Sequence, residues 1–158
     1  IRPAGAWHPV WNTVVGVAIP LIMSAYVGIA ERAVEIALEG ARKRPEAPHI
    51  APLVGEMLDS FQTAVDLVDA MIRDADDLQF ANTDDITIRD LSRKTVAVDA
   101  LITTVRQAIE VTGGMGFMRS SDLERLYRDV HGSIFHPLPR AKQVLLTGRM
   151  ALGLGATG

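Results

Sequence analysis

The sequence contains no cysteine in its 158 residues, and aromatic residues make up only 5% of it. The absence of cysteine excludes disulfides, a thiolate nucleophile and a zinc-thiolate site. The scarcity of rings means that aliphatic side chains must fill the interior. Hydrophobic residues amount to 48% and charged residues to 22%, which is typical of a globular domain. At this length the chain is one domain or a piece of a larger protein.

An excess of positive charge is also lacking. The formal net charge is −3, which argues against nucleic acid as the main partner because proteins bind its phosphates with basic residues. Residues 59–90 hold nine Asp and two Arg, whereas residues 119–149 hold six basic and three acidic residues. The acidic stretch predicts a solvated outer face. The basic stretch is compatible with ordinary surface or with a site for an anion such as a pyrophosphate.

Charged residues are absent from Val10 to Ala30. This window is long enough to cross a membrane as a helix, which takes ~20 apolar residues. It nevertheless contains polar residues and a central Pro20, and it continues without a break into a charged sequence from Glu31. These features favour a helix buried in a protein core or subunit interface over one buried in lipid. We expect no membrane span and a cytoplasmic protein.

Proline and glycine are both missing from Glu56 to Thr112. This run is too long for one ordinary helix, and the polar cluster at residues 82–85 supplies turn and N-cap residues that divide it in two. We expect the second helix to end where Gly113 adopts the left-handed C′ conformation. Apolar residues recur at a helical period on both sides of the cluster. They are Val54, Leu58, Phe61, Val65, Val68 and Ile72, followed by Ile88, Leu91, Val98, Ile102, Val105 and Ile109.

Three further helices complete the predicted fold. The first begins near Pro9 or Pro20 and ends near Gly40, a short one occupies residues 121–129 behind a Ser-Asp-Leu-Glu capping box, and the last occupies about residues 140–152. No stretch shows the period-two alternation of a strand. The sequence predicts an all-α protein, an antiparallel up-and-down four-helix bundle with one additional short helix.

Metal and dinucleotide motifs are not found. The run Gly113-Gly114-Met115-Gly116 follows a predicted helix and not a strand, so it is not a dinucleotide-binding fingerprint. His131 and His136 would lie about 140° apart on a helix and would not share a metal ion. We predict no metal site.

Two spaced motifs lie near the C-terminus. They read Ala108-Ile-Glu-Val-Thr-Gly-Gly-Met-Gly-Phe117 and Ser121-Asp-Leu-Glu-Arg-Leu-Tyr-Arg-Asp129. With Val27-Gly-Ile-Ala-Glu-Arg-Ala33 and Leu53-Val-Gly-Glu-Met57, they resemble the C-terminal domain of the acyl-CoA dehydrogenase superfamily. The resemblance implies that residues 1–158 are the helical bundle domain of a larger flavoenzyme, without its N-terminal helical domain and β-domain.

The resemblance also implies FAD as cofactor and a site for it. Glu110, Gly113, Gly114 and Gly116 match the loop that approaches the FAD of a neighbouring subunit, and Arg44 matches an arginine that contacts the flavin nucleotide. Glycine lets backbone amides come close to a diphosphate, although Gly113 would equally serve as a helix C-cap. The family further implies a homo-oligomer, a dimer or tetramer, and a small-molecule substrate such as an acyl-CoA thioester.

The catalytic base of the family has no match in this chain. The resemblance places the usual glutamate eight residues beyond Asp129, where this chain has Pro137, and a less common position just before Pro20 holds Ala18 and Ile19. None of these side chains accepts a proton. The leading interpretation is still an oxidoreductase acting on CH–CH bonds of acyl-CoA thioesters in fatty acid metabolism, with its base elsewhere in the protein.

Two other interpretations stay open. The sequence Tyr127-Arg-Asp-Val-His131, with His136 after it, resembles the flavin-dependent monooxygenase branch of the superfamily, which uses reduced flavin and oxygen and needs no carboxylate base. His131 is then the candidate catalytic group, hydrogen-bonded to a substrate phenol, although it would equally hold the short helix against its neighbour. The missing glutamate also allows a catalytically silent assembly domain.

Overall fold

The computed structural model describes residues 8–156, and those residues form helices and no strand. Five α-helices follow one another, with three short 3-10 helices between them. The all-α prediction is confirmed. The α-helices are α1 (Val10–Ala41), α2 (Ile50–Ala75), α3 (Asp84–Thr112), α4 (Asp122–Val130) and α5 (Arg140–Ala151), and the 3-10 helices are η1 (Asp76–Leu78), η2 (Gly114–Phe117) and η3 (His131–Phe135).

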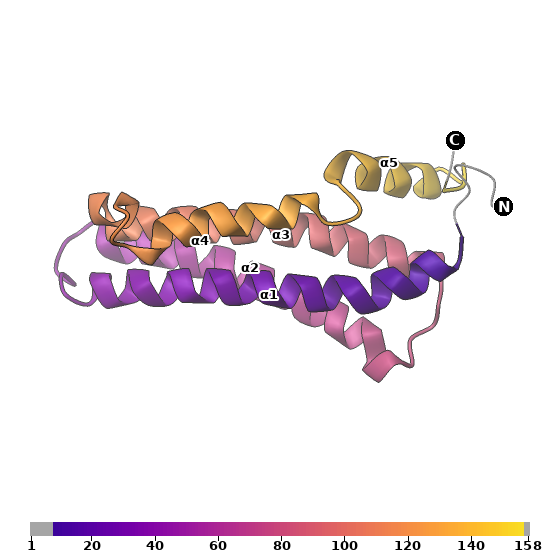
Figure 1. Cartoon of the computed structure of the whole chain (residues 1–158), viewed down its shortest axis with the longest axis horizontal. Coiled ribbons are helices and arrows are strands. Elements are labelled where there is room, and N and C mark those ends of the chain that lie inside the picture. Colours follow the sequence, from indigo (N-terminus) through magenta and orange to yellow (C-terminus); the bar gives the residue numbers. More distant parts are fainter. Residues whose placement is uncertain (1–7, 157–158) are drawn as a thin grey trace.

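Three long helices form the body of the bundle. α1, α2 and α3 lie side by side in alternating directions, and each packs against the other two (Figure 1). α4 packs against both α1 and α3, whereas α5 packs mainly on α3 toward the opposite end of the bundle (Figure 1). The predicted antiparallel bundle is therefore confirmed.

The fourth position in the bundle belongs to the short α4 and not to α5. α4 buries Leu123, Leu126 and Val130, whose spacing of three and four residues places them on one face. α5 buries only Gln143 and Leu146 among its residues. Because burial of an apolar face attaches a helix to a bundle, α4 completes the core and α5 is an addition to α3. The sequence predicted both helices, but it gave the fourth position to the last helix and made the short helix the additional one.

The charge-free window forms the first part of α1. Pro20 lies inside this helix and is buried, and its carbonyl accepts a hydrogen bond from the Ser24 hydroxyl at 2.8 Å. The helix therefore starts after Pro9 and not at Pro20. By length and composition α1 would be able to cross a membrane. It packs against α2, α3 and α4, and 33% of its most apolar window is buried in the structure.

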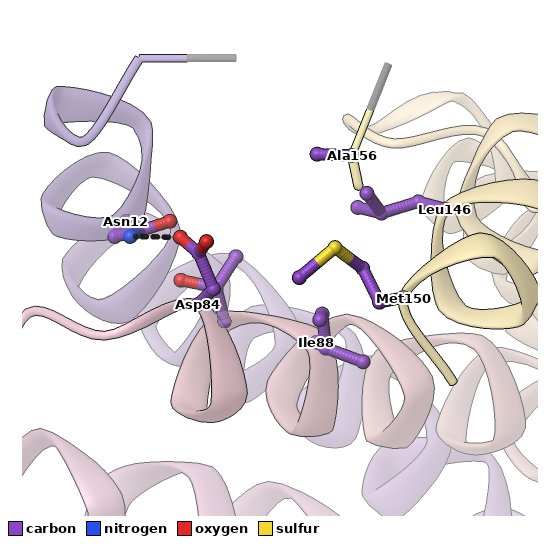
Figure 2. Close-up of a pocket in the computed structure, with 7 residues that line it drawn as sticks. Asn12, Asp84, Ile88, Leu146, Met150 and Ala156 are labelled. Atoms are coloured by element: carbon purple, nitrogen blue, oxygen red, sulfur yellow. Dashed lines mark hydrogen bonds between the residues drawn. The ribbon is translucent and has the colours of Figure 1, made fainter. Parts of the chain in front are cut away.

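α5 is attached through a packed seam at the start of α1 and α3. Met150 of α5 reaches toward Ile88 of α3, and Asn12 Nδ2 donates to Asp84 Oδ1 at 2.8 Å beside them (Figure 2). The seam leaves about 0 Å³ for a water-sized molecule. It therefore holds the helices together and is not a ligand site.

The helix junctions follow the predicted turn and cap residues, with two differences. Thr83 caps α3, since its Oγ1 accepts from Ile86 N–H at 3.4 Å. α2 ends earlier than the polar cluster because residues 76–78 adopt positive φ angles of 41°, 48° and 68°, which a right-handed helix does not contain. Ser121 caps α4 by accepting from Leu123 N–H at 3.3 Å, while its own N–H donates to the Met118 carbonyl at 2.8 Å. The predicted N-cap is therefore present, but the reciprocal bonds of a capping box with Glu124 are not formed.

The acidic stretch is solvated except at its end. Asp90 is 1% exposed, and its Oδ1 accepts from Arg93 at 3.0 Å, while Arg93 also pairs with Asp74 of α2 at 2.6 Å. Oδ2 of Asp90 has no partner within residues 8–156. Desolvation raises the pKa of Asp90 to about 6 despite the hydrogen bond from Arg93. The prediction of a solvated face is wrong for this one residue, which the core of the bundle encloses.

Candidate functional site

Two parts of the molecule carry the residues predicted to bind or react. The first, which we call the glycine loop, comprises residues 113–117 and follows α3. The second, the histidine segment, comprises residues 131–138 and follows α4. α4 runs between the two (Figure 1), so their separation is fixed by a helix packed on the core.

The glycine loop begins with a backbone conformation that favours glycine. Gly113 has a φ of 77° and a ψ of −161°. Its N–H donates to the Ile109 carbonyl at 2.8 Å, and the Gly116 N–H donates to the Gly113 carbonyl at 2.8 Å. The positive φ explains the glycine. The ψ lies outside the left-handed helical region, so the predicted left-handed conformation is wrong, and the chain leaves α3 extended before turning into η2.

Arg44 reaches this loop from the connection between α1 and α2. Its guanidinium donates to the carbonyl of Thr112 at 2.9 Å and to that of Val111. A Cβ atom on Gly113 would lie 3.9 Å from the same guanidinium. The last carbonyls of a helix have no partners within it, so Arg44 caps α3 at its electronegative end. The structure thus brings Arg44 and Gly113 together at the end of α3.

The other predicted cofactor residues differ in accessibility. Glu110 and Gly114 are exposed, and Glu110 forms an ion pair with Arg106 one turn earlier on α3. Gly116 is buried, and a Cβ atom there would lie 3.2 Å from Leu123 Cδ1 of α4. Glycine at position 116 is therefore explained by the packing of α4, whereas Glu110 and Gly114 are open to a ligand.

An open groove of about 590 Å³ adjoins the glycine loop. Its lining includes the basic Arg32 and Lys43, the acidic Glu39 and Asp122, and Thr112 at the end of α3. Both signs of charge therefore face the groove. It suits a polar group that carries donors as well as acceptors.

His131, the candidate catalytic residue, is engaged with the helix before it. Its Nδ1 lies 2.6 Å from the Tyr127 carbonyl, and the two rings meet edge to face with centroids 4.8 Å apart. Because a carbonyl only accepts, Nδ1 carries a proton and donates. These contacts brace the end of α4 within the same helix, and they do not join it to a neighbouring helix, which was the second role that the sequence allowed for His131.

His136 has a partner from a different helix. Its Nε2 lies 2.8 Å from the Tyr26 hydroxyl of α1, with the rings edge to face and centroids 5.4 Å apart. Burial raises the pKa of Tyr26, so the phenol stays protonated at neutral pH. A Cβ atom on Gly132 would lie 2.7 Å from the same hydroxyl, which explains glycine there. Residues 8–156 contain no group of three or more His, Asp or Glu side chains that would hold a metal ion.

Lys94 of α3 fixes the histidine segment from the other side. It is 3% exposed, and its Nζ donates to the His136 carbonyl at 3.0 Å and to the Leu138 carbonyl at 3.5 Å. Burial, reinforced by the charge of Arg140, lowers the pKa of Lys94. The ammonium therefore holds two backbone carbonyls beside the imidazole that Tyr26 contacts.

The sequence interpretation missed Tyr26 and Lys94, although each left a signal. Tyr26 is a polar aromatic residue inside a charge-free window. In α3 the apolar series jumps seven residues, from Leu91 to Val98, and Lys94 and Thr95 occupy the turn between them. A polar residue at an apolar position of a long helix indicates a buried polar contact.

Comparison with known proteins identifies the bundle. Residues 13–134 match the family model described as acyl-CoA dehydrogenase, C-terminal domain. Cyclohex-1-ene-1-carbonyl-CoA dehydrogenase from Geobacter metallireducens is 28% identical over 130 residues, which are 80% of this chain and 34% of that protein. The structure of KijD3 in complex with FMN and a dTDP-linked amino keto sugar gives a TM-score of 0.82 at 23% identity, over 100% of this chain and 41% of that chain. The 3-HSA hydroxylase from Rhodococcus sp. RHA1 gives 0.78 at 19% identity, over 96% and 41%.

The extent of these matches differs. This chain spans about a third of the length of the matched dehydrogenase and about two fifths of each matched structure. At their low identities the two structures establish the fold alone. The family model covers nearly all of the bundle, from α1 into η3. The chain therefore belongs to the acyl-CoA dehydrogenase family, in which it corresponds to the helical C-terminal domain.

Proposed function

We propose that the full-length protein is a flavin-dependent oxidoreductase and that this chain supplies part of its flavin site and of its subunit contacts. Family membership supports a flavin, and the matched KijD3 structure contains FMN. The expectation of FAD rests on the resemblance of the glycine loop.

The residues of the glycine loop fit a flavin nucleotide. Arg44 caps α3 with both hydrogen bonds from one terminal nitrogen, and a guanidinium has five donors, so it can bind an anion at the same time. Nothing lies within 4 Å of the position that a Cβ atom on Gly114 would take. Arg44, Gly113 and Gly114 would hold the diphosphate, with Glu110 one turn away. A bound flavin would carry the electrons, taking them up from the substrate in a dehydrogenase or giving them to oxygen in a monooxygenase.

We further propose that the reaction uses oxygen. The observation that carries this proposal is the residue at the position of the usual base, Pro137, which accepts no proton. Next to it His136 Nε2 and the Tyr26 hydroxyl lie 2.8 Å apart. This pair would hold or move a proton at the substrate without a carboxylate, and the monooxygenase branch needs no carboxylate base.

An acyl-CoA dehydrogenase is the second candidate. The relative from Geobacter metallireducens, which is 28% identical to this chain, is named as the dehydrogenase of an acyl-CoA compound. In this case a carboxylate outside the two usual positions would remove the α-proton of the thioester substrate. The substrate would be an acyl-CoA thioester.

A test on the full-length, flavin-loaded protein separates these candidates. We expect no bleaching of the oxidised flavin by a panel of acyl-CoA thioesters under anaerobic conditions, and oxygen-dependent hydroxylation when a reductase supplies reduced flavin. We expect His136→Gln to lower kcat at least tenfold, and His131→Gln, as the matched control, to change it little. Bleaching by any thioester would establish the dehydrogenase, and purification without flavin would support a silent assembly domain.

The flavin site and the oligomer have tests of their own. We expect Arg44→Met to reduce the flavin content of the purified protein, and Arg42→Met, an exposed neighbour, to leave it unchanged. We also expect a dimer or tetramer by light scattering, because Leu58 and Ile72 of α2 and Leu145 of α5 are 39%, 48% and 63% exposed and would be covered by a second copy. A cytoplasmic location is part of the same proposal.

A further inference from the structure

We propose that Lys94 is a positioning residue that holds the His136 imidazole against the Tyr26 hydroxyl through the backbone of the histidine segment. The inference rests on the proposed function, since it takes His136 and Tyr26 as the pair that would hold or move the proton. Lys94 acts indirectly, because its ammonium contacts two backbone carbonyls and its helix, α3, carries neither ring.

The chain around His136 has few hydrogen-bond donors of its own. Residues 136–139 read His-Pro-Leu-Pro, and proline has no backbone N–H. His136 follows the last residue of η3 with a φ of −68° and a ψ of 144°, so the helical backbone ends before it. The orientation of this short extended stretch therefore depends on contacts from other helices.

Lys94 supplies such a contact from α3. Its Nζ donates to the carbonyl of His136 at 3.0 Å and to that of Leu138 at 3.5 Å. The residue is 3% exposed, so little water competes for the ammonium, and hydrogen bonds from a charged donor are about twice as strong as neutral ones. The carbonyl and the imidazole of His136 are attached to the same Cα atom. Holding the carbonyl therefore limits the directions in which the imidazole leaves the backbone.

Tyr26 of α1 is held just as closely on the other side of the imidazole. Its hydroxyl lies 2.8 Å from His136 Nε2, and a Cβ atom added to Gly132 would lie 2.7 Å from the same hydroxyl. α1 and α3 pack directly against each other, so the same core sets the positions of Tyr26 and Lys94. A displacement of about 1 Å at a reacting group can lower a rate about 100-fold. We therefore expect the contact of Lys94 with the His136 backbone to affect the rate as well as the stability.

The first test compares single and double variants of the full-length, flavin-loaded protein. Lys94→Met keeps an unbranched side chain and removes the donor, and we expect it to lower kcat about tenfold with less than about a twofold change in KM. Because Lys94 acts through His136, the same substitution should lower kcat no further in a His136→Gln background. Lys142→Met, at an exposed position of α5, is the control and should leave kcat unchanged. Losses that multiply in the double variant would overturn the proposal.

The second test observes the hydrogen bond by NMR and does not depend on the reaction. In protein made with isotope-labelled histidine, the Nε2 resonance of His136 reports the contact with Tyr26, and Tyr26→Phe gives its position when the contact is broken. We expect Lys94→Met to move the resonance toward that position and Lys142→Met to leave it in place. An unchanged resonance in Lys94→Met would overturn the proposal. A changed resonance, with kcat unchanged in both Lys94→Met and His136→Gln, would support the positioning role and refute the proposed function.

A milder variant covers the case in which Lys94→Met does not fold. Lys94→Gln retains N–H donors on a shorter side chain, so its kcat and its Nε2 resonance should lie between those of the parent and those expected for Lys94→Met. Its effect on kcat should likewise vanish in the His136→Gln background. A loss of kcat that persists there would overturn the proposal.

Discussion

The glycine loop and the histidine segment are held in place by different means. The glycine loop depends on backbone features, namely the positive φ of Gly113 and the capping of α3 by Arg44, and much of it is exposed. The histidine segment is held by side chains from two other helices, Tyr26 of α1 and Lys94 of α3. The glycine loop is therefore fixed by the end of α3, with much of its surface accessible. The histidine segment is rigid only as long as the bundle is.

Among the substitutions that test this difference, the removal of Lys94 is expected to lower the free energy of unfolding most. Lys94→Met leaves the carbonyls of His136 and Leu138 without their donor, and we expect the free energy of unfolding to fall by about 3 kcal/mol. Lys142→Met, at an exposed position of α5, should change it by less than about 0.5 kcal/mol. Urea unfolding of the chain at pH 7 measures both. Equal effects would mean that the buried ammonium does not stabilise the segment.

Asp90 provides a second buried charge on α3, with an oxygen that lacks a partner. Its pKa rises from 3.8 to about 6 on folding through desolvation, so the folded state binds the proton more tightly and stability falls as the pH rises from about 4 to 6. We expect a loss of about 2 kcal/mol over that range, and Asp90→Asn should remove it.

Asp74 also faces Arg93, but its pKa shifts in the opposite direction, so it does not produce the same pH dependence. Burial raises its pKa, but hydrogen bonds from Arg93 and Arg89 outweigh this and lower it. The ionised Asp74 therefore stabilises the fold above pH 3.8, the ordinary pKa of its carboxyl group, and this contribution is lost as the pH falls below that value. The loss is expected in the parent and in Asp90→Asn alike. Urea unfolding from pH 4 to 7 gives the slope. A slope that persists in Asp90→Asn would assign the dependence to another group.

The contact between Tyr26 and the histidine segment is tested by steric rescue. A Cβ atom on Gly132 would lie 2.7 Å from the Tyr26 hydroxyl but 3.5 Å from Cζ, so Gly132→Ala should destabilise the chain by about 2 kcal/mol. Adding Tyr26→Phe removes the clashing atom and should restore about half of the loss. A double-mutant cycle measures the coupling. Additive effects would show that the two positions do not meet.

Substitutions in the glycine loop are expected to change the stability least, and the change should differ between its glycines. Gly116→Ala places a methyl group 3.2 Å from Leu123 and Thr112, and we expect it to cost about 1 kcal/mol. Gly114→Ala meets nothing within 4 Å and should be close to neutral. Thermal unfolding distinguishes the two. A Gly114→Ala variant that lost flavin without losing stability would sharpen the view of this loop as a binding surface.

Local signals in the sequence predicted the helices and much of the glycine loop. The cap of α3 was predicted within the polar cluster at residues 82–85 and that of α4 at Ser121, and Thr83 and Ser121 do cap these helices, because a cap is decided by the residue and its next three neighbours. The prediction that α5 is the fourth helix of the bundle was wrong, because α4 takes that position. The spacing of apolar residues shows that a helix has an apolar face, but not which helix that face packs against. Glu110 and Gly114 remain cofactor predictions, supported by their exposure.

By itself the sequence determined the helical architecture, because caps and apolar spacing act over a few residues. Its motifs also carried the resemblance to the family, which the family model confirms, and with it the position of the glycine loop. Only the tertiary structure decided that His136, and not His131, meets a residue from another helix. Tyr26 and His136 are 110 residues apart, and their contact exists because α1 and α3 pack against each other and against α4. The burial of Lys94, Thr95 and Asp90 was decided in the same way, since burial belongs to the assembled bundle and to no single helix.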